Sequence, residues 1–413
     1  MLRSYPGFCI VALLILTACD PATRGGADWN GSIRDSAGIT IVENPADGIW
    51  TESTQWRLVE DLRIGSVDSD SSYQFGDIGG IGVGPAGHII VLDNQADRSL
   101  RVFDAHGVLA ASSGRRGSGP GEFQSGAGPV FVSGDSLAVI PDDGNGRVNL
   151  FDTNGSYVRS IRVTLGEMTN KWGATSQGIP VLQLGLSMMP GMEETDDFVD
   201  VLLAIGTDGT GRDTLLVFPS GRQMYYQGGS PELTFFAPEP WWVIGHDDVV
   251  WMGVNDRYTI GTYENGVLTR LTSRAQDPVF LSERDRDVVL DAWIRIFSQR
   301  IPNAEAMLSQ LAQFHDVFPA YQQFMVNSDG ALWVQRVLIP STLTEQEAAA
   351  FDPTAGWGSR IWDVFDRDGH YLGDIEFPGR FALASLRGDQ AYGVWTDDLD
   401  VQYVMRLRVV QGD

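Results

Sequence analysis

The sequence predicts an all-β fold, a six-bladed β-propeller built from four-stranded antiparallel blades. Three observations predict it. A unit of about 48 residues recurs along the chain, short apolar runs within each unit alternate with polar residues at period two, and turns rich in Gly, Asp and Asn separate these runs. Four-stranded units of roughly 40–55 residues that pack radially are typical of propeller blades.

The repeat is clearest when residues 88–114 are compared with residues 135–161. Phe103 and Phe151 lie 48 residues apart, and each is followed by Asp, two further residues and Gly. The same placement of an aromatic or aliphatic residue shortly before a glycine occurs at Ile205, Tyr263 and Phe365, and a sixth, degenerate copy covers 381–410. Six copies indicate six blades.

Each copy divides into four strands. In the first copy, residues 88–92, 100–103 and 108–110 are short runs of high β-propensity separated by turn residues, and the glycine-rich run 79–84 supplies a fourth. Glycine suits the innermost strand because large side chains do not fit where the strands crowd around the axis. The last copy lacks an obvious fourth strand, and residues 56–65 stand where one is needed. We therefore expect both chain ends to close one blade, which removes two sheet edges, with residues 38–44 packed nearby.

The N-terminus does not belong to the fold. Residues 9–18 are apolar but too short to span a bilayer, and they end in Leu-Thr-Ala-Cys, residues 16–19. This motif resembles the bacterial lipobox, whose cysteine becomes lipidated. We predict a lipoprotein signal peptide at 1–18, a lipidated tether at 19–36 attached through Cys19, and the propeller at 37–413. The expected location is the cell envelope, on the periplasmic side of the inner or the outer membrane.

Composition excludes several classes of partner. The net charge is −25, from 54 acidic and 29 basic residues, and Lys171 is the only lysine. Such a chain repels nucleic acid and anionic lipid headgroups.

The two cysteines are Cys9 and Cys19. The first leaves with the signal peptide and the second carries lipid, so the mature chain forms no disulfide. We expect a monomer.

Residues 114–123, GRRGSGPGEF, resemble a phosphate-binding loop at first sight. A phosphate loop needs a following helix whose N-terminus faces the anion. Here a predicted strand follows, and no Lys-Ser or Lys-Thr pair is present. The segment is therefore predicted to be a turn between two blades.

Two segments resemble a known family. GSGPGEF followed by VFVSGDSLAVIPDDGNGRVNLFDTNG, and FPAYQQFMVNSDGALWV at 318–334, are similar to the NHL-type six-bladed β-propellers, which are often bacterial lipoproteins. The resemblance covers about residues 60–410. It implies the fold and says little about function.

Strand direction separates the connections into two classes. We name the strands of a blade a to d from the axis outward. The b–c loops and the d–a crossings between blades then lie on one face, and the a–b and c–d turns on the other. All long segments fall in the first class, so we call its side the insertion-bearing face and the opposite side the turn face. The long segments are 187–197, 219–233, 281–316 and 340–358.

The longest of these segments, 281–316, is predicted to form a helical hairpin between blades four and five. Ser282 and Asp285 are spaced as a capping box, and an apolar stripe follows at helical spacing. A second apolar stripe follows Pro302. Both stripes need cover, so we expect the hairpin to act as a lid or a buttress over the insertion-bearing face. Loops that carry function cluster on one side of a rigid scaffold.

Two sets of residues are candidates for binding on that face. Recurrent arginines could ring the channel mouth and bind an anion, or each could pair with a blade carboxylate. Apolar residues in the insertions could form a partner surface, or they could pack the helices onto the propeller. The arginines are Arg98, Arg115, Arg116, Arg147, Arg257 and Arg360, and the apolar residues are Met188, Met189, Met192, Tyr225, Tyr226 and Trp357.

We predict a membrane-anchored, exported binding scaffold for a protein or a small ligand, without catalysis and without a required cofactor. The alternative is a metal-dependent hydrolase of the lactonase or esterase type, with its site at the channel mouth. Six-bladed hydrolases resembling gluconolactonases hold a metal, commonly Ca²⁺, with Glu, Asn and Asp, and oxygen ligands suit such a cation. Turn chemistry also explains these residues. The weak candidate ligands are Asp93, Asn94, Asp142, Asn255 and Asp256.

Overall fold

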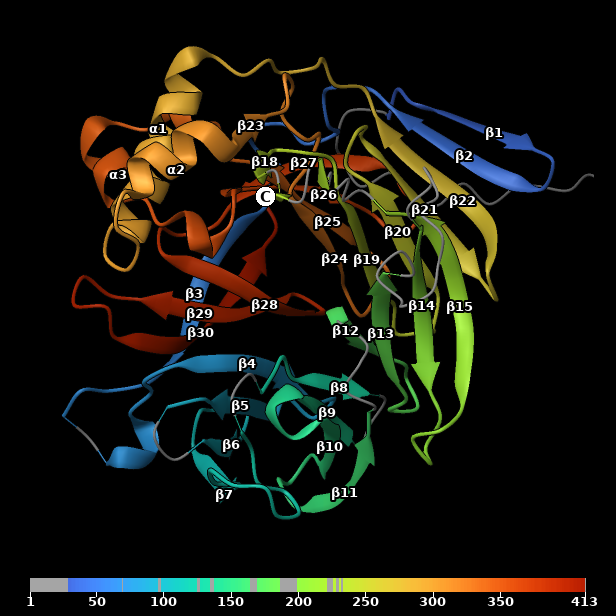
Figure 1. Ribbon diagram of the computed structural model, residues 1–413. Helices are drawn as coiled ribbons and strands as arrows, with labels where there is room; N and C mark the ends of the chain where they lie inside the picture. Colours follow the sequence, from blue (N-terminus) through green and yellow to red (C-terminus); the bar gives the residue numbers. More distant parts are fainter. Residues whose placement is uncertain are drawn as a thin grey trace, which may run out of the picture.

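The computed structural model confirms the six-bladed β-propeller (Figure 1). It describes residues 29–412 except 69, 96–97, 125–126, 134–136, 164–168, 186–198, 221–225, 228–229 and 232. The innermost strands of the six blades contact one another in a closed cycle, which makes the ring. The predicted signal peptide and Cys19 lie outside the described residues. Among the described residues, no helix has the length and apolar character that a bilayer crossing requires.

Each blade contains four antiparallel strands in the order expected from the repeat. Blade one consists of β4 (Ile78–Val83), β5 (Ile89–Asp93), β6 (Ser99–Phe103) and β7 (Leu109–Ser113), and blade two of β8 (Phe131–Ser133), β9 (Leu137–Asp142), β10 (Arg147–Asp152) and β11 (Tyr157–Arg162). Blade three consists of β12 (Thr169–Ala174), β13 (Pro180–Gly185), β14 (Val199–Ile205) and β15 (Arg212–Pro219). Blade four contains β19 (Pro240–Ile244), β20 (Val250–Val254), β21 (Thr259–Glu264) and β22 (Val267–Arg274). Blade five contains β24 (Gln323–Val326), β25 (Leu332–Val337), β26 (Gly358–Phe365) and β27 (Tyr371–Glu376).

Blade six confirms the predicted closure by the two chain ends. It consists of β28 (Phe381–Arg387), β29 (Gln390–Thr396), β30 (Gln402–Val410) and, from the start of the chain, β3 (Arg57–Ile64). β3 pairs antiparallel with β30, from Arg57 opposite Val410 to Ile64 opposite Val404. The first strand of the ring therefore completes the last blade.

The expectation for residues 38–44 is wrong. β2 (Ile39–Asn44) pairs parallel with β22 at the outer edge of blade four rather than packing near blade six. β1 (Ser32–Ser36) pairs with β2, so the end of the segment predicted as tether is a strand. The Asn44 side chain, which is 4% exposed, fixes the hairpin because it donates to the carbonyl oxygens of Ser273 and Gly369 and accepts from the backbone N–H of Tyr371.

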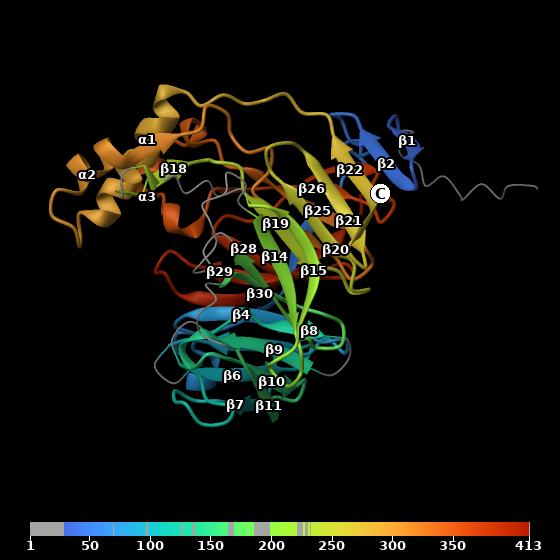
Figure 2. The same ribbon diagram turned by 45° about the vertical axis from the view of Figure 1, so that its right-hand side comes forward.

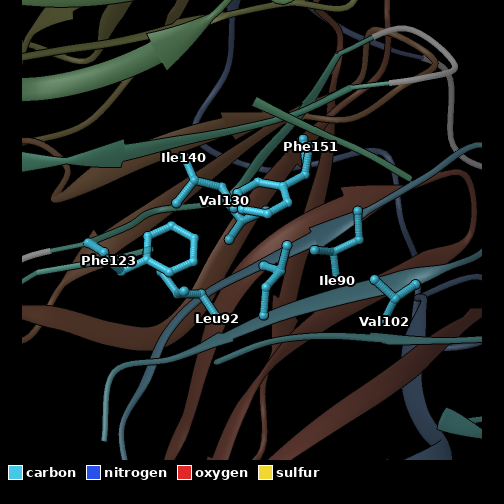
Figure 3. Close-up of a cluster of buried hydrophobic side chains, with 10 residues drawn as sticks. Ile90, Leu92, Val102, Phe123, Val130, Ile140 and Phe151 are labelled. Atoms are coloured by element: carbon cyan, nitrogen blue, oxygen red, sulfur yellow. The ribbon is translucent and has the colours of Figure 1, made fainter. Parts of the chain in front are cut away.

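The core lies between neighbouring blades, as the repeat requires. Figure 3 shows the cluster between blades one and two, where the rings of Phe123 and Phe151 stack with centroids 5.6 Å apart. Phe103 is fully buried, as Phe151 is, so the aromatic residue of the repeat is a core residue. The inner strands are crowded as expected: a Cβ on Gly82 would lie 2.7 Å from the side chains of Val130 and Val132. Glycine is thus required there for space.

Three helices lie together at one end of the molecule in both ribbon views (Figures 1 and 2). They are α1 (Glu283–Phe297), α2 (Ala304–Leu311) and α3 (Glu345–Ala350). The capping box predicted at Ser282 and Asp285 begins α1. The short strands β18 (Leu233–Phe235) and β23 (Ala312–Phe314) pair beside the helices, and β16 (Tyr226–Gln227) pairs with β17 (Ser230–Pro231). Four short 3₁₀ turns complete the described elements: Ser71–Tyr73, Asp143–Asn145, Pro340–Thr342 and Pro353–Ala355.

Candidate functional site: the insertion-bearing face and the central cavity

The described long connections between blade strands confirm the assignment of faces. The segment from β22 to β24 is a d–a crossing and carries α1 and α2, whereas the segment from β25 to β26 is a b–c loop and carries α3. These two insertions build one structure, because α1 packs against α2, α3 and both 3₁₀ turns beside α3. We call residues 281–316 and 338–357 together the cap.

The cap is a packed unit rather than a loose lid. Val289 of α1 packs in one buried cluster with Phe235, Phe236 and Phe318, which lie outside the cap. The buried Asp285 carboxylate ties its two insertions together, since it accepts from Ser282 at the start of α1 and from the backbone N–H of Ser341. The cap is therefore a buttress on the insertion-bearing face, and it shares a hydrophobic cluster with segments outside it.

A short exposed strip lies at the base of the cap. Residues 275–280 are all exposed, and the Phe280 side chain is 70% exposed. The backbone there is nevertheless held on both sides, because Leu281 donates to Asp316 and Phe318 donates to Val279. An aromatic side chain is thus presented to solvent in a fixed position.

Four of the six predicted arginines pair with carboxylates, which is the alternative that the repeat suggested. Arg147 binds the buried Asp142, with Nε 3.2 Å from Oδ2. Arg115 pairs with the partly buried Glu122, and the exposed pairs are Arg257 with Asp256 and Arg360 with Glu376. Arg98 occupies a left-handed turn with φ of 49°, and Arg116 makes a backbone bridge to Phe123.

The glycine-rich segment 114–123 is a turn, as predicted. Its backbone folds back on itself, since Phe123 donates to Arg115 and Gly117 donates to Phe123. The Glu122 carboxylate accepts from Arg115 and from the backbone N–H of Gly119, and these bonds lower its pKa, with the backbone bond as the larger cause. The Glu122 carboxylate therefore occupies the position that a bound phosphate would take in a phosphate-binding loop.

The apolar candidates divide between two outcomes. Trp357 packs inside the cap, with its ring centroid 4.9 Å from that of Phe236 and 5.1 Å from that of Phe351, so the packing alternative holds for it. Tyr226 lies in β16, and nothing is described of its side chain. Met188, Met189, Met192 and Tyr225 lie outside the described residues.

The candidate metal ligands are engaged in contacts that build the blades. Asp93 accepts from the backbone N–H of Asp77 and pairs with Arg101. Asn94 donates to the Ala127 carbonyl oxygen. The other three are used in the same way: Asp142 binds Arg147 and Gln124, Asn255 bridges Glu239 and Tyr321, and Asp256 pairs with Arg257. No group of three or more His, Cys, Asp or Glu in the described part of the chain could hold a metal ion.

A central cavity of about 210 Å³ is lined by residues from all six innermost strands. From five of these strands it takes the C-terminal part, and from blade two it takes all of β8. In blades three and four it also takes the start of the a–b turn, as at Ser176 and His246. The cavity therefore occupies the half of the channel that lies toward the turn face, away from the cap.

Three basic side chains line this cavity: Lys171 of β12, His246 beyond β19 and Arg387 of β28. The sequence did not identify them as a group because no motif joins them. The one available signal was that Lys171 is the only lysine of the chain. Burial lowers the pKa of the Lys171 ammonium well below its usual value, and burial followed by the charge of Arg387 lowers the pKa of His246.

No protein-family model and no curated protein matches the sequence. Solved structures of low identity do match. A member of the DUF4221 family from Bacteroides vulgatus is 11% identical, with a TM-score of 0.51 over 87% of this chain and 100% of that one. A protein from Bacteroides fragilis that is described as exported is 14% identical, with a TM-score of 0.49 over 90% and 100% of the two chains.

A gluconolactonase from Xanthomonas campestris is also similar, with 11% identity and a TM-score of 0.40 over 86% of this chain and 97% of that one. Identities this low extend to the fold and not to chemistry, and only the first of the three similarities is strong enough to support the fold. The resemblance to NHL-type propellers stays a prediction. This chain shares the architecture of a six-bladed β-propeller, and its function follows from its own residues.

Proposed function

We propose that this protein is an exported propeller, anchored by a lipid on Cys19, which holds a partner protein of the cell envelope against its insertion-bearing face. The motif at residues 16–19 supports the export and the anchor. The cap supports the choice of face, because a rigid scaffold that concentrates its insertions on one side is typical of binding proteins. Most of the candidate arginines and metal ligands form ion pairs or hydrogen bonds that stabilise the blades, and this favours binding over catalysis.

The observation that carries this proposal is the ordered, exposed Phe280. A side chain of this size gains about 1.5–3 kcal/mol from full burial, and here 70% of it remains in water on a backbone fixed by neighbouring hydrogen bonds. Aromatic anchors of this kind dominate the energy of protein interfaces. Asp277 of the strip is exposed, and so is Asp316, which pairs with Arg286 and whose backbone oxygen accepts from Leu281. The complementary surface is an apolar pocket with a basic rim.

The position of Phe280 can be tested by photo-cross-linking in cells that make the full chain. We expect a photoreactive phenylalanine analogue at residue 280 to give one discrete protein adduct. The matched control places the analogue at Val158, which is 49% exposed on the outer strand of blade two. Adducts of the same pattern at both positions, or none at residue 280, would contradict the proposal.

The variant Phe280→Asp separates binding from stability. Because the side chain is exposed, we expect the free energy of unfolding to change by less than about 0.5 kcal/mol. The adduct formed by an analogue placed at the neighbouring Val279 should disappear, because a buried carboxylate in an apolar pocket is costly. Urea unfolding measures the first result and immunoblotting the second. Retention of the adduct in this variant would show that Phe280 is not the anchor.

The lipid anchor has a separate test. Cys19→Ser removes the only thiol that the predicted signal leaves on the mature chain. We expect labelled palmitate to be incorporated into the unaltered protein and not into this variant, because serine cannot form the thioether that carries the lipid. Autoradiography of the purified protein measures this, and Cys9→Ser is the control that should incorporate label. Absence of label from the unaltered protein, or equal labelling of both variants, would remove the anchor from the proposal.

A further inference from the structure

We propose that the central cavity is a second binding site, independent of the cap, for a small organic anion: a carboxylate or phosphate group on a compact apolar body. The anionic group is held by Lys171 and Arg387, and the body lies against partly exposed apolar side chains of the channel wall, such as Ile244 and Met325. This site faces away from the insertion-bearing face, so occupancy of one site leaves the other accessible.

The cavity has the volume for such a ligand. One water molecule needs roughly 10–15 Å³ of cavity volume, and this cavity has about 210 Å³. Because all six innermost strands contribute to its wall, the cavity is part of the rigid ring and does not depend on a mobile loop. A preformed concave site of this kind loses little free energy to ordering when a ligand binds.

The charge of the wall is opposite to that of the chain. Acidic residues outnumber basic ones by 54 to 29 overall, whereas the ionisable residues that line the cavity in the described part of the chain are Lys171, His246 and Arg387, with no Asp or Glu among them. A concave surface lined by one sign of charge concentrates ligands of the other sign. In a protein that repels anions from its surface, this wall selects for an anion that can enter the channel.

Lys171 has unused hydrogen-bonding capacity. Its Nζ donates to the Trp242 carbonyl oxygen and lies 3.2 Å from the centroid of the Trp241 ring. An ammonium has three N–H donors, and in the described part of the chain no carboxylate pairs with this one. Burial disfavours the charged amine, as its lowered pKa shows. A bound anion would restore the ammonium form by pairing with it.

Arg387 is the second basic group of the cavity wall that has no carboxylate partner among the described residues. It lines the same cavity from β28, and among the residues described its guanidinium makes no ion pair and no side-chain hydrogen bond. The other arginines of the blade interiors, such as Arg147 and Arg336, are satisfied by buried carboxylates. A guanidinium binds a carboxylate or phosphate through two parallel N–H bonds, which are among the strongest in proteins.

The remaining wall favours an apolar body behind the anionic group. Val132, Ile244 and Met325 line the cavity and are partly exposed. Trp242 is fully buried behind them, where its ring packs on Gly173. An apolar group that covers the partly exposed side chains gains free energy from their burial. We therefore expect benzoate to bind more tightly than inorganic phosphate, and both more tightly than the uncharged benzamide.

The single lysine makes a test on the unaltered protein possible. Reductive methylation with formaldehyde and cyanoborohydride modifies only neutral amines, so Lys171 and the α-amino group are the only targets, and peptide mass spectrometry separates them. At constant ionic strength, benzoate at ten times its dissociation constant should slow methylation of Lys171 about tenfold, because occupied sites shield the amine. Benzamide at the same concentration should not slow it, and the α-amino group is the internal control.

Two variants locate the binding group. Arg387→Gln should weaken benzoate binding about tenfold or more in calorimetry, since the charge-assisted pair is lost. Arg115→Gln, which alters an arginine that is 78% exposed on the insertion-bearing face, should bind benzoate unchanged. Phe280→Asp should also bind benzoate unchanged, so failure of this proposal is distinguishable from failure of the partner surface. The proposal is overturned if benzoate and phosphate leave the methylation rate of Lys171 unchanged, or if Arg387→Gln binds as the unaltered chain does.

Discussion

Replacing Asp363 with asparagine is expected to lower the free energy of unfolding by about 3–5 kcal/mol, the cost of breaking a buried ion pair by removing one partner. The Asp363 carboxylate is fully buried in β26. One oxygen accepts from Arg336 and the Tyr371 hydroxyl, and the other accepts from Arg274 and the Tyr258 hydroxyl. The amide would present its NH2 group to the donors on one side and would remove the buried negative charge with which both guanidinium groups pair.

The effect reaches beyond one blade because the partners come from two. Arg274 and Tyr258 belong to blade four, whereas Arg336 and Tyr371 belong to blade five. Burial, followed by the negative charge of Asp363, raises the pKa of the Tyr258 hydroxyl, which therefore stays protonated and donates. The network fastens the two blades that carry the cap.

Urea unfolding measures this change, and the control lies on the same blade. Glu376→Gln breaks the ion pair with Arg360, in which the two side chains are 57% and 60% exposed. Exposed pairs contribute about 0–1 kcal/mol, so the control should unfold close to the unaltered chain. A loss below about 1 kcal/mol for Asp363→Asn would show that water or rearranged side chains replace the carboxylate.

Removing β3 is expected to prevent formation of a stable ring, whereas removing only β1 and β2 is not. A chain that starts at Ser66 leaves blade six with three strands and exposes the edge of β30, which is then free to pair with other chains. It also loses Ile64, which is 2% exposed and whose burial is worth about 1.5–3 kcal/mol by itself. The lost burial of Ile64 and the lost hydrogen bonds between β3 and β30 together approach the free energy of unfolding of a typical domain.

The matched control is a chain that starts at Pro45. It lacks the hairpin on blade four and keeps β3. We expect this chain to be monomeric in size-exclusion chromatography with a cooperative thermal transition, and the chain from Ser66 to aggregate without one. Similar midpoints for both chains would mean that closure by β3 adds little to stability.

The ring was predictable because each blade has local sequence patterns that recur along the chain. The run at 79–84, the phenylalanines 48 residues apart and the glycine turns each report a local requirement of the blade, and the structure places them accordingly. The helices of the cap were predictable for the same reason, since Ser282 and Asp285 form a local capping signal.

Contacts that depend on distant partners were not predictable. The parallel pairing of β2 with β22 depends on Asn44 reaching Gly369 and Tyr371, and no local pattern reports this. The basic wall of the cavity is a similar case. Lys171, His246 and Arg387 come from three blades and meet only because the ring closes. The arginines that recur with the repeat were easier to find in the sequence, but four of them pair with carboxylates of the blades.

The hairpin on blade four also determines how mechanical load enters the molecule. A pull on residue 29 acts first on β1 and then on β2, whose parallel ladder with β22 and the Asn44 hydrogen bonds resist it. The strand that closes the ring, β3, comes later in the chain and is shielded until that ladder gives way. A force applied to residue 29 is therefore resisted by the hairpin on blade four before it reaches the pairing of β3 with β30 that closes the ring.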